Sequence, residues 1–191
     1  MKVLKIVGSI LGWVVVGFLL VAMVFNIVDK STGYKAPLFG LRPTAIVTES
    51  MASVNEANTY VDPSWDRINK DDVVLTKNCN YEDINQYDVI TFITKDGILI
   101  CHRVIDLYEV DGEKYLVTRG DANNTNDAPI KASEVRGKVI SIWRGLGKLV
   151  SFVSSLYFVL AIFASMFFIA LGYIIYILIR DKEKKGDQTK K

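Results

Sequence analysis

Two long uncharged, apolar runs near the ends of this 191-residue chain constrain its fold more than any other feature. One run covers residues 6–28 and the other covers residues 149–179. An α-helix rises about 1.5 Å per residue, so each run is long enough to cross the ~30 Å hydrocarbon core of a bilayer. The sequence therefore predicts two transmembrane helices, with residues 29–148 forming one domain between them.

A removed secretory signal is the alternative interpretation of the first run, because Lys2 and Lys5 give it a charged start. The run is, however, longer than the roughly 7–15 apolar residues of a typical signal core. It also lacks a following small-x-small cleavage site. We therefore expect an uncleaved membrane anchor.

The charges outside the two apolar runs predict an orientation in the membrane. Basic residues occur before the first run, in residues 1–5, and after the second, in residues 180–191. Residues 29–148 contain 15 Lys and Arg against 18 Asp and Glu. Because basic flanks favour the cytoplasmic side, we expect both termini in the cytoplasm and the middle domain outside the cell membrane. The mildly acidic middle domain also argues against nucleic acid as a partner.

The middle domain has the pattern of a β fold, because short runs rich in β-branched and aromatic residues recur between turn signals. We expect residues 51–71 to be an irregular surface excursion and residues 121–134 to be an Asn-rich loop. The fold class is therefore mainly β, with a β domain flanked by two transmembrane α-helices. The predicted strands cover residues 44–48, 73–77, 89–94, 98–110, 113–119 and 135–143.

Two Asp-Gly dipeptides, at residues 96–97 and 111–112, separate predicted strands. Such a pair suits a two-residue hairpin loop, because glycine readily adopts the positive φ of a type I′ turn. The two hairpins predict a three-stranded meander with residues 98–110 in its centre.

The second hairpin also predicts a pairing register. With residues 111–112 as the loop, Val110 faces Glu113, and continuing the ladder places His102 opposite Asp121. A bulge within the ladder would shift this pairing by one residue.

His102 is the only histidine in the chain. A histidine among apolar strand residues is commonly structural, but it can also act as a general base near neutral pH. Ser50, at the end of the first predicted strand, would be an ordinary turn residue without a base and a nucleophile with one. Asp121 and Asp127 would be solvated turn residues or partners of such a base. One histidine and two cysteines without ligand spacing predict neither a metal site nor a cofactor.

Taken together, these segments resemble type I signal peptidases of the ER-type branch, which has members in eukaryotes, archaea and some Gram-positive bacteria and uses a Ser/His/Asp set. The resemblance covers roughly residues 40–148. The similar segments, in the family's order, are Ser50-Met51, Asp72-Val73-Val74, Asp88-Val89-Ile90-Thr91-Phe92, His102-Arg103-Val104, Gly120-Asp121-Ala122-Asn123-Asn124 with Asp127, and Gly137-Lys138-Val139.

The resemblance implies a membrane-bound serine endopeptidase that removes N-terminal signal peptides from exported preproteins after small residues. By position, Ser50 would be the nucleophile, His102 the general base, Asp127 the third member of the set, and Asp121 a second important aspartate. The hairpin register favours Asp121 as the neighbour of His102, whereas the motif favours Asp127, so both remain candidates. The implied partners are signal-peptide-bearing preproteins, membrane lipid and a secretion translocon, with no cofactor.

Other interpretations remain open. The family usually has a proline soon after Ser-Met, which this chain lacks; the alternative function is therefore a non-enzymatic, membrane-tethered β-domain that acts as an assembly factor. A Ser/Lys enzyme would use Lys77 or Lys95 as its base. Cys79 and Cys101 could pair or remain free thiols, and Cys101 is a further candidate nucleophile.

Overall fold

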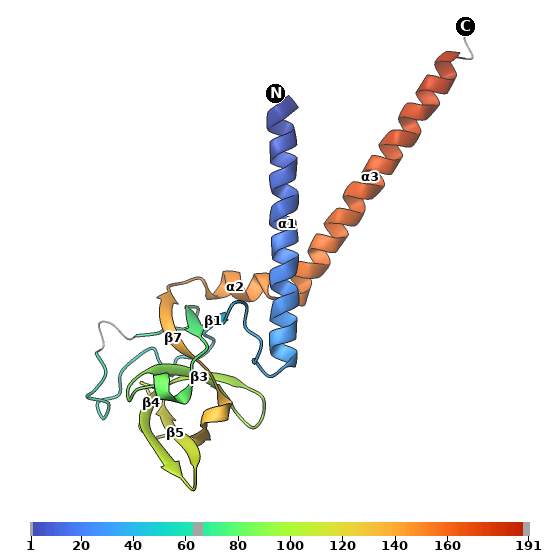
Figure 1. Cartoon of the computed structure of the whole chain (residues 1–191). Coiled ribbons are helices and arrows are strands. Elements are labelled where there is room, and N and C mark those ends of the chain that lie inside the picture. The colour runs from blue at the N-terminus through green and yellow to red at the C-terminus, as the bar shows by residue number, and fades with distance from the viewer. Residues whose placement is uncertain (1, 63–66, 189–191) are drawn as a thin grey trace. The chain divides into compact units, whose positions relative to one another are not determined.

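A computed structural model describes residues 2–62 and 67–188, with side chains left out at residues 2–11, 156, 159 and 181–188. The chain divides into two compact units, one reaching to Ser151 and the other beginning at Phe152 (Figure 1). The first unit contains a helix and a seven-stranded antiparallel sheet, and the second unit is helical. The prediction of a mainly β fold with flanking apolar helices is confirmed.

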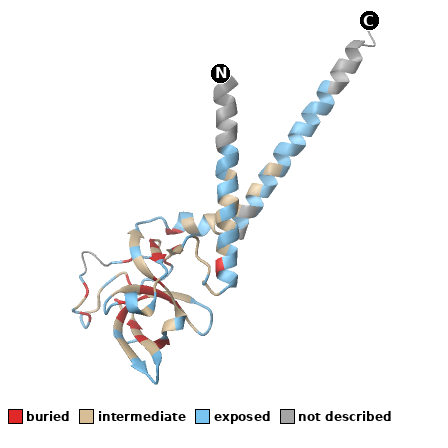
Figure 2. Cartoon of the chain, in the orientation of Figure 1, coloured by how far each residue is buried: buried red, intermediate tan, exposed pale blue. Residues whose placement is uncertain are grey.

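Three α-helices lie outside the sheet: α1 (Lys2–Ser31), α2 (Gly147–Val153) and α3 (Leu156–Gln188). Within them, Gly12–Ser31 and Leu160–Arg180 have mean hydropathies of 2.1 and 2.5, and almost none of their described side chains are buried. Figure 2 shows this exposure along α1 and α3. An apolar helix that buries so little of its surface inside the protein is suited to lipid. Two helices are therefore long and apolar enough to cross a membrane.

The second uncharged run, residues 149–179, is shared between two helices and is not one continuous helix. The interruption falls at Ser154 and Ser155. The Ser155 hydroxyl accepts a hydrogen bond from the Phe158 backbone N–H (3.2 Å), which is the N-cap arrangement at the start of α3. The capping serine thus explains where α3 begins.

The sheet has the strand order β1-β2-β7-β3-β4-β5-β6, and every neighbouring pair is antiparallel. The predicted β3–β4–β5 meander, with β4 in its centre, is confirmed. Two 3₁₀ turns (Tyr81–Asp83 and Ala132–Glu134) complete the elements. The strands are β1 (Leu41–Ala45), β2 (Val73–Lys77), β3 (Val89–Ile93), β4 (Leu99–Val110), β5 (Glu113–Arg119), β6 (Ile130–Lys131) and β7 (Val135–Trp143).

Two predictions, one of a strand and one of a loop, were wrong in detail. The first strand covers residues 41–45 and not 44–48; it includes Pro43, which an edge strand such as β1 tolerates because one side of its backbone needs no ladder partner. The predicted Asn-rich loop 121–134 contains the two-residue strand β6, too short to leave a hydrophobic pattern.

The two Asp-Gly hairpins differ. Asp111 and Gly112 both have positive φ (51° and 79°), and Val110 pairs with Glu113, as expected for a two-residue loop. At the other hairpin the expected two-residue loop is wrong: Ile93 pairs with Leu99, and only Gly97 has positive φ (78°). This loop has three residues, 95–97, closed by hydrogen bonds between Thr94 and Ile98.

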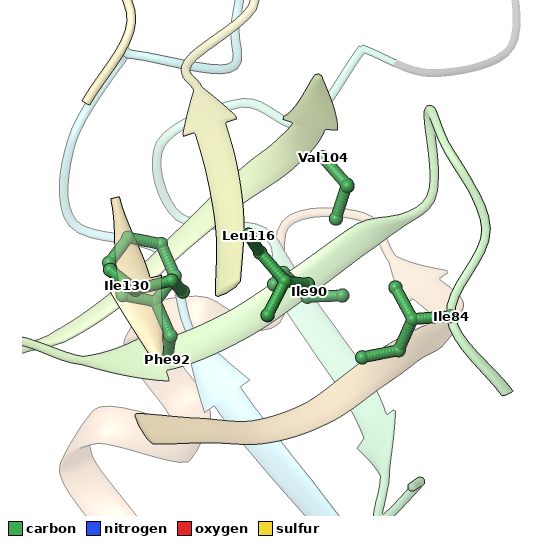
Figure 3. Packing of buried hydrophobic residues seen from close by; sticks show 6 residues of the cluster. All are labelled: Ile84, Ile90, Phe92, Val104, Leu116 and Ile130. Carbon is green, nitrogen blue, oxygen red and sulfur yellow. The ribbon is translucent and has the colours of Figure 1, made fainter. Parts of the chain in front are cut away.

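Two groups of buried apolar side chains hold the sheet. The first lies between β3, β4, β5 and β6 and includes Ile84, Ile90, Phe92, Val104, Leu116 and Ile130 (Figure 3). The second comprises Ile46, Met51, Ile68 and Val74.

The second group corrects the prediction that residues 51–71 are a surface excursion. The described part of this segment is irregular, as expected, but Met51 and Ile68 are 2% and 0% exposed. Met51 and Ile68 are therefore part of the core next to the chain segment that contains Ser50, and their burial contributes to the stability of the fold.

Candidate active site

Ser50, His102 and Asp127 form a continuous hydrogen-bonded series. Ser50 Oγ lies 3.1 Å from His102 Nε2, and His102 Nδ1 lies 2.6 Å from Asp127 Oδ2. Ser50 follows β1, His102 is on β4, and Asp127 is in the loop between β5 and β6. The fold therefore brings together three residues separated by up to 77 positions in the chain. This is the geometry in which an imidazole can take a proton from a hydroxyl while a carboxylate orients the ring.

The backbone around Ser50 is fixed by the loop that follows β5. The Ser50 carbonyl accepts a hydrogen bond from the Ala122 N–H (2.8 Å), and Met51 Sδ accepts one from the Asp121 N–H (3.3 Å). Gly120 lies next to both Ser50 and His102. A Cβ added to Gly120 would stand 2.8 Å from Ser50 O and 3.0 Å from His102 Nε2. Only glycine fits without displacing these atoms.

Asp127 is held by Thr118 as well as by His102. The Thr118 hydroxyl donates to Asp127 Oδ2 (2.7 Å), and the Asp127 N–H donates to the Thr118 carbonyl (2.8 Å). Burial raises the pKa of Asp127, but hydrogen bonds from His102 and Thr118 outweigh it, so the pKa lies below its ordinary value. An ionised carboxylate accepts only, so it selects the tautomer with the proton on His102 Nδ1. His102 Nε2 then presents its lone pair to Ser50.

The predicted register between β4 and β5 was wrong near the site. Pairs from Val110–Glu113 to Asp106–Val117 follow the expected ladder, but Val104 then pairs with Thr118. A bulge at Ile105 shifts the remaining pairs by one residue, so the expected pairing of His102 with Asp121 is not formed.

The structure places Asp121 against Arg103 instead. Arg103 donates from Nε and Nη2 to the two carboxylate oxygens of Asp121 (2.9 and 2.7 Å), and from Nη1 to the Tyr87 carbonyl (2.9 Å). Consecutive strand residues point to opposite faces, so His102 and Arg103 reach different aspartates. Because Asp121 also contacts Met51 through its backbone, this ion pair supports the loop that holds Ser50.

Ser50 and His102 line a groove of about 320 Å³. Its walls come from the segment 44–48 and from residues 98–101, and most of the lining side chains are apolar, among them Ile46, Val47 and Ile98. The Thr48 hydroxyl is 3.4 Å from Ser50 Oγ and is a polar group close to the nucleophile candidate.

The described hydrogen bonds of Ser50 Oγ go to His102 and Thr48, and not to a cysteine or lysine considered from the sequence. Cys79 and Cys101 are free thiols in contact with different core groups. Burial, aided by Asp121, raises the pKa of Cys101 to about 12, which disfavours a reactive thiolate. Lys77 ends β2, and Lys95 is in the β3–β4 loop. Among the described residues, no group of three or more His, Cys, Asp or Glu side chains is placed to hold a metal ion.

Sequence reasoning missed the roles of Thr118 and Thr48, and it named Gly120 only as part of a motif, without its contact with Ser50. Thr118 had one usable signal, since it alternates with Leu116 on β5 and therefore shares its buried face. No sequence pattern marks the close approach of Gly120 to Ser50, because that contact is formed only by the tertiary fold.

Models of known protein families give no match to this chain. No curated protein matches it either. The function of this protein is therefore inferred from its sequence motifs and from the geometry of the site.

Proposed function

We propose that this protein is a membrane-bound serine endopeptidase, a signal peptidase I, that cleaves N-terminal signal peptides from exported preproteins after small residues. One observation carries the proposal: Ser50 Oγ, His102 and Asp127 form a hydrogen-bonded series of 3.1 and 2.6 Å. The series lies beside an apolar groove, in a chain with two helices of membrane-spanning length. The motifs that resemble the ER-type branch contain the same three residues.

In the proposed reaction, Ser50 Oγ attacks the scissile carbonyl while His102 Nε2 takes the hydroxyl proton. His102 then donates that proton to the leaving amine, which leaves the signal peptide as an ester on Ser50. Water, deprotonated by His102, hydrolyses this ester and regenerates the hydroxyl. The Ser50 N–H and the Thr48 hydroxyl are the proposed donors to the oxyanion, because Thr48 lies 3.4 Å from Ser50 Oγ.

The groove supports a preference for small residues in an extended substrate. Residues 44–48 line the groove and include the end of β1, an edge strand whose outer side can pair with a peptide. A volume of about 320 Å³, shared between several substrate positions, favours short apolar side chains.

The basic flanks support an orientation with both termini in the cytoplasm and the β domain outside. In that orientation the apolar part of a signal peptide stays in the bilayer while its cleavage site emerges on the side of Ser50. The proposed localisation is therefore a cell membrane, with two spans.

The test uses the detergent-solubilised full chain and a labelled preprotein, and it maps the new N-terminus. We expect the wild type to cut after a small residue and Ser50→Ala to cut nothing. Ser53→Ala is the matched control, because Ser53 is exposed three residues away, and it should cut normally. Cleavage of the same bond by Ser50→Ala would overturn the proposal. A wild type that cuts no preprotein would favour the non-enzymatic alternative.

A further inference from the structure

A buried carboxylate stands at the end of the first apolar helix. Asp29 lies in the last turn of α1 and is 7% exposed. A negative charge there is opposed by the helix dipole, and a buried charge without a partner is strongly destabilising. Specific contacts must therefore compensate Asp29.

Arg42, on β1, provides that compensation. Its Nε and Nη2 donate to the two carboxylate oxygens of Asp29 (2.5 and 3.0 Å), and the Ala36 N–H donates to the same carboxylate (2.9 Å). The side chain of Arg42 is also buried. Such a two-point contact fixes the relative orientation of the two side chains as well as their distance.

The same arginine also binds two backbone carbonyls, one in the segment that follows α1 and one on β7. Arg42 Nη2 donates to the Tyr34 carbonyl (2.6 Å), and Nη1 donates to the Arg136 carbonyl on β7 (3.0 Å). Arg136 in turn donates from Nε to the Gly33 carbonyl (2.6 Å). We name the Asp29, Arg42 and Arg136 contacts the helix clamp. The clamp connects the end of α1 to two strands of the sheet.

Eight residues of chain lead from Arg42 in the clamp to Ser50, the nucleophile candidate. The chain is extended in β1 as far as Ala45 and bends at residues 48 and 49, just before Ser50. This segment is held at both ends. Arg42 to Ala45 pair with β2, Ile46 exchanges backbone hydrogen bonds with Asp71 and Asp72, and the Ser50 carbonyl accepts a hydrogen bond from the Ala122 N–H. The position of Ser50 is thereby tied to the end of α1.

We propose that the helix clamp fixes the height of Ser50 above the lipid and so selects which peptide bond of a membrane-inserted signal peptide is cut. This inference rests on the proposed function. The length of its apolar segment fixes how deep a signal peptide lies in the bilayer, and therefore how far each of its peptide bonds lies from the lipid. A nucleophile must be held at a fixed height above the lipid to cut the same bond in every molecule. If residues 32–40 were a flexible link, its root-mean-square end-to-end distance would be about 16 Å. The height of Ser50 above the lipid would then vary over a comparable range. Asp29 and Arg42 are thus positioning residues for the reaction.

The experiment compares two substrates of the full-length protein in liposomes. One is a preprotein inserted in the bilayer, and the other is a short soluble peptide with the same cleavage site and no apolar segment. The first variant is Asp29→Asn, which leaves the buried charge of Arg42 without its counter-charge. The second is Asp29→Leu/Arg42→Met, which removes both charges together. The matched control is Lys114→Met, which breaks the exposed pair with Glu82 in the same domain.

For both clamp variants we expect kcat/KM on the soluble peptide within about twofold of the wild type. On the inserted preprotein we expect kcat/KM to fall by about 10- to 100-fold, because a displacement of the nucleophile by about 1 Å has an effect of this size. New N-termini should spread over neighbouring bonds, and preproteins with lengthened spacers should become substrates. Lys114→Met should cut one bond at the wild-type rate.

Two outcomes would overturn the inference while leaving the proposed function intact. One is cleavage of the inserted preprotein by the clamp variants at the single wild-type bond and rate. The other is an equal loss on both substrates, which would mean that the clamp only stabilises the fold. If the wild type cuts neither substrate, both the proposed function and this inference are wrong.

Discussion

Two neighbouring residues of β4 make contrasting pairs with two aspartates of the same loop. The His102–Asp127 pair is partly accessible, with side chains 9% and 27% exposed, and it touches Ser50. The Arg103–Asp121 pair is 4% and 1% exposed and bidentate. An imidazole can gain and lose a proton, whereas a guanidinium keeps its charge. Alternation along one strand thus separates a pair suited to proton transfer from one suited to support.

The largest expected effect follows removal of the base. His102→Ala leaves the Ser50 hydroxyl without a proton acceptor, so in the proposed reaction kcat should fall by about 10⁶-fold, the loss known for serine proteases. The measurement is preprotein cleavage at equal amounts of membrane-inserted protein. A loss of less than about tenfold would show that His102 is not the base.

Asp127→Asn should have the next largest effect. The amide cannot hold the Nδ1-protonated tautomer as a carboxylate does, so kcat should fall by about 10⁴-fold. Circular dichroism should show a folded β domain. Wild-type kcat in this variant would contradict the assigned contact between Asp127 and His102.

Asp121→Asn should affect stability more than kcat. It leaves the Arg103 guanidinium buried without its counter-charge, so the free energy of unfolding should fall by about 3–5 kcal/mol. Chemical denaturation of the detergent-solubilised chain measures this loss. If Asp121→Asn instead reduced kcat as much as Asp127→Asn with unchanged stability, the two pairs would have exchanged roles.

Thr118→Val should give the smallest effect, a loss of about tenfold in kcat. It also removes a hydrogen bond that lowers the pKa of Asp127. The stabilisation from ionised Asp127 is present above its unfolded-state pKa of about 3.9 and is lost as pH falls through its lower folded pKa. In Thr118→Val the folded pKa lies closer to the unfolded value, so the acid-dependent loss should be smaller and complete at a higher pH than in the wild type. Acid unfolding curves that coincide with the wild type, or a Thr118→Ser variant that fails to restore them, would contradict this.

Local patterns in the sequence predicted much of the fold. The bounds of β2, β5 and β7, the type I′ turn at Asp111-Gly112 and the central place of β4 follow from residue alternation and turn chemistry. Ser50, His102 and Asp127 were named from their motifs, and the structure brings them together.

The remaining features depend on tertiary contacts. The bulge at Ile105 leaves no mark on the hydrophobic pattern, and it moves the predicted partner of His102 by one position. Met51 and Ile68 are isolated apolar residues in a polar segment, and their burial follows from packing against Val74. The helix clamp joins residues far apart in the sequence, so no local pattern indicates it.

The tautomer of His102 is the most direct test of the central claim, because a single histidine gives a single imidazole signal pair in a ¹⁵N-histidine-labelled protein. At mildly alkaline pH, the ¹⁵N chemical shifts should show that Nδ1 carries the proton and that Nε2 carries none, and the Nδ1 proton should resonate far downfield. Asp127→Asn should abolish that downfield signal, and Ser50→Ala should shift Nε2 alone. A proton on Nε2 in the wild type, or a spectrum unchanged by Asp127→Asn, would contradict the account.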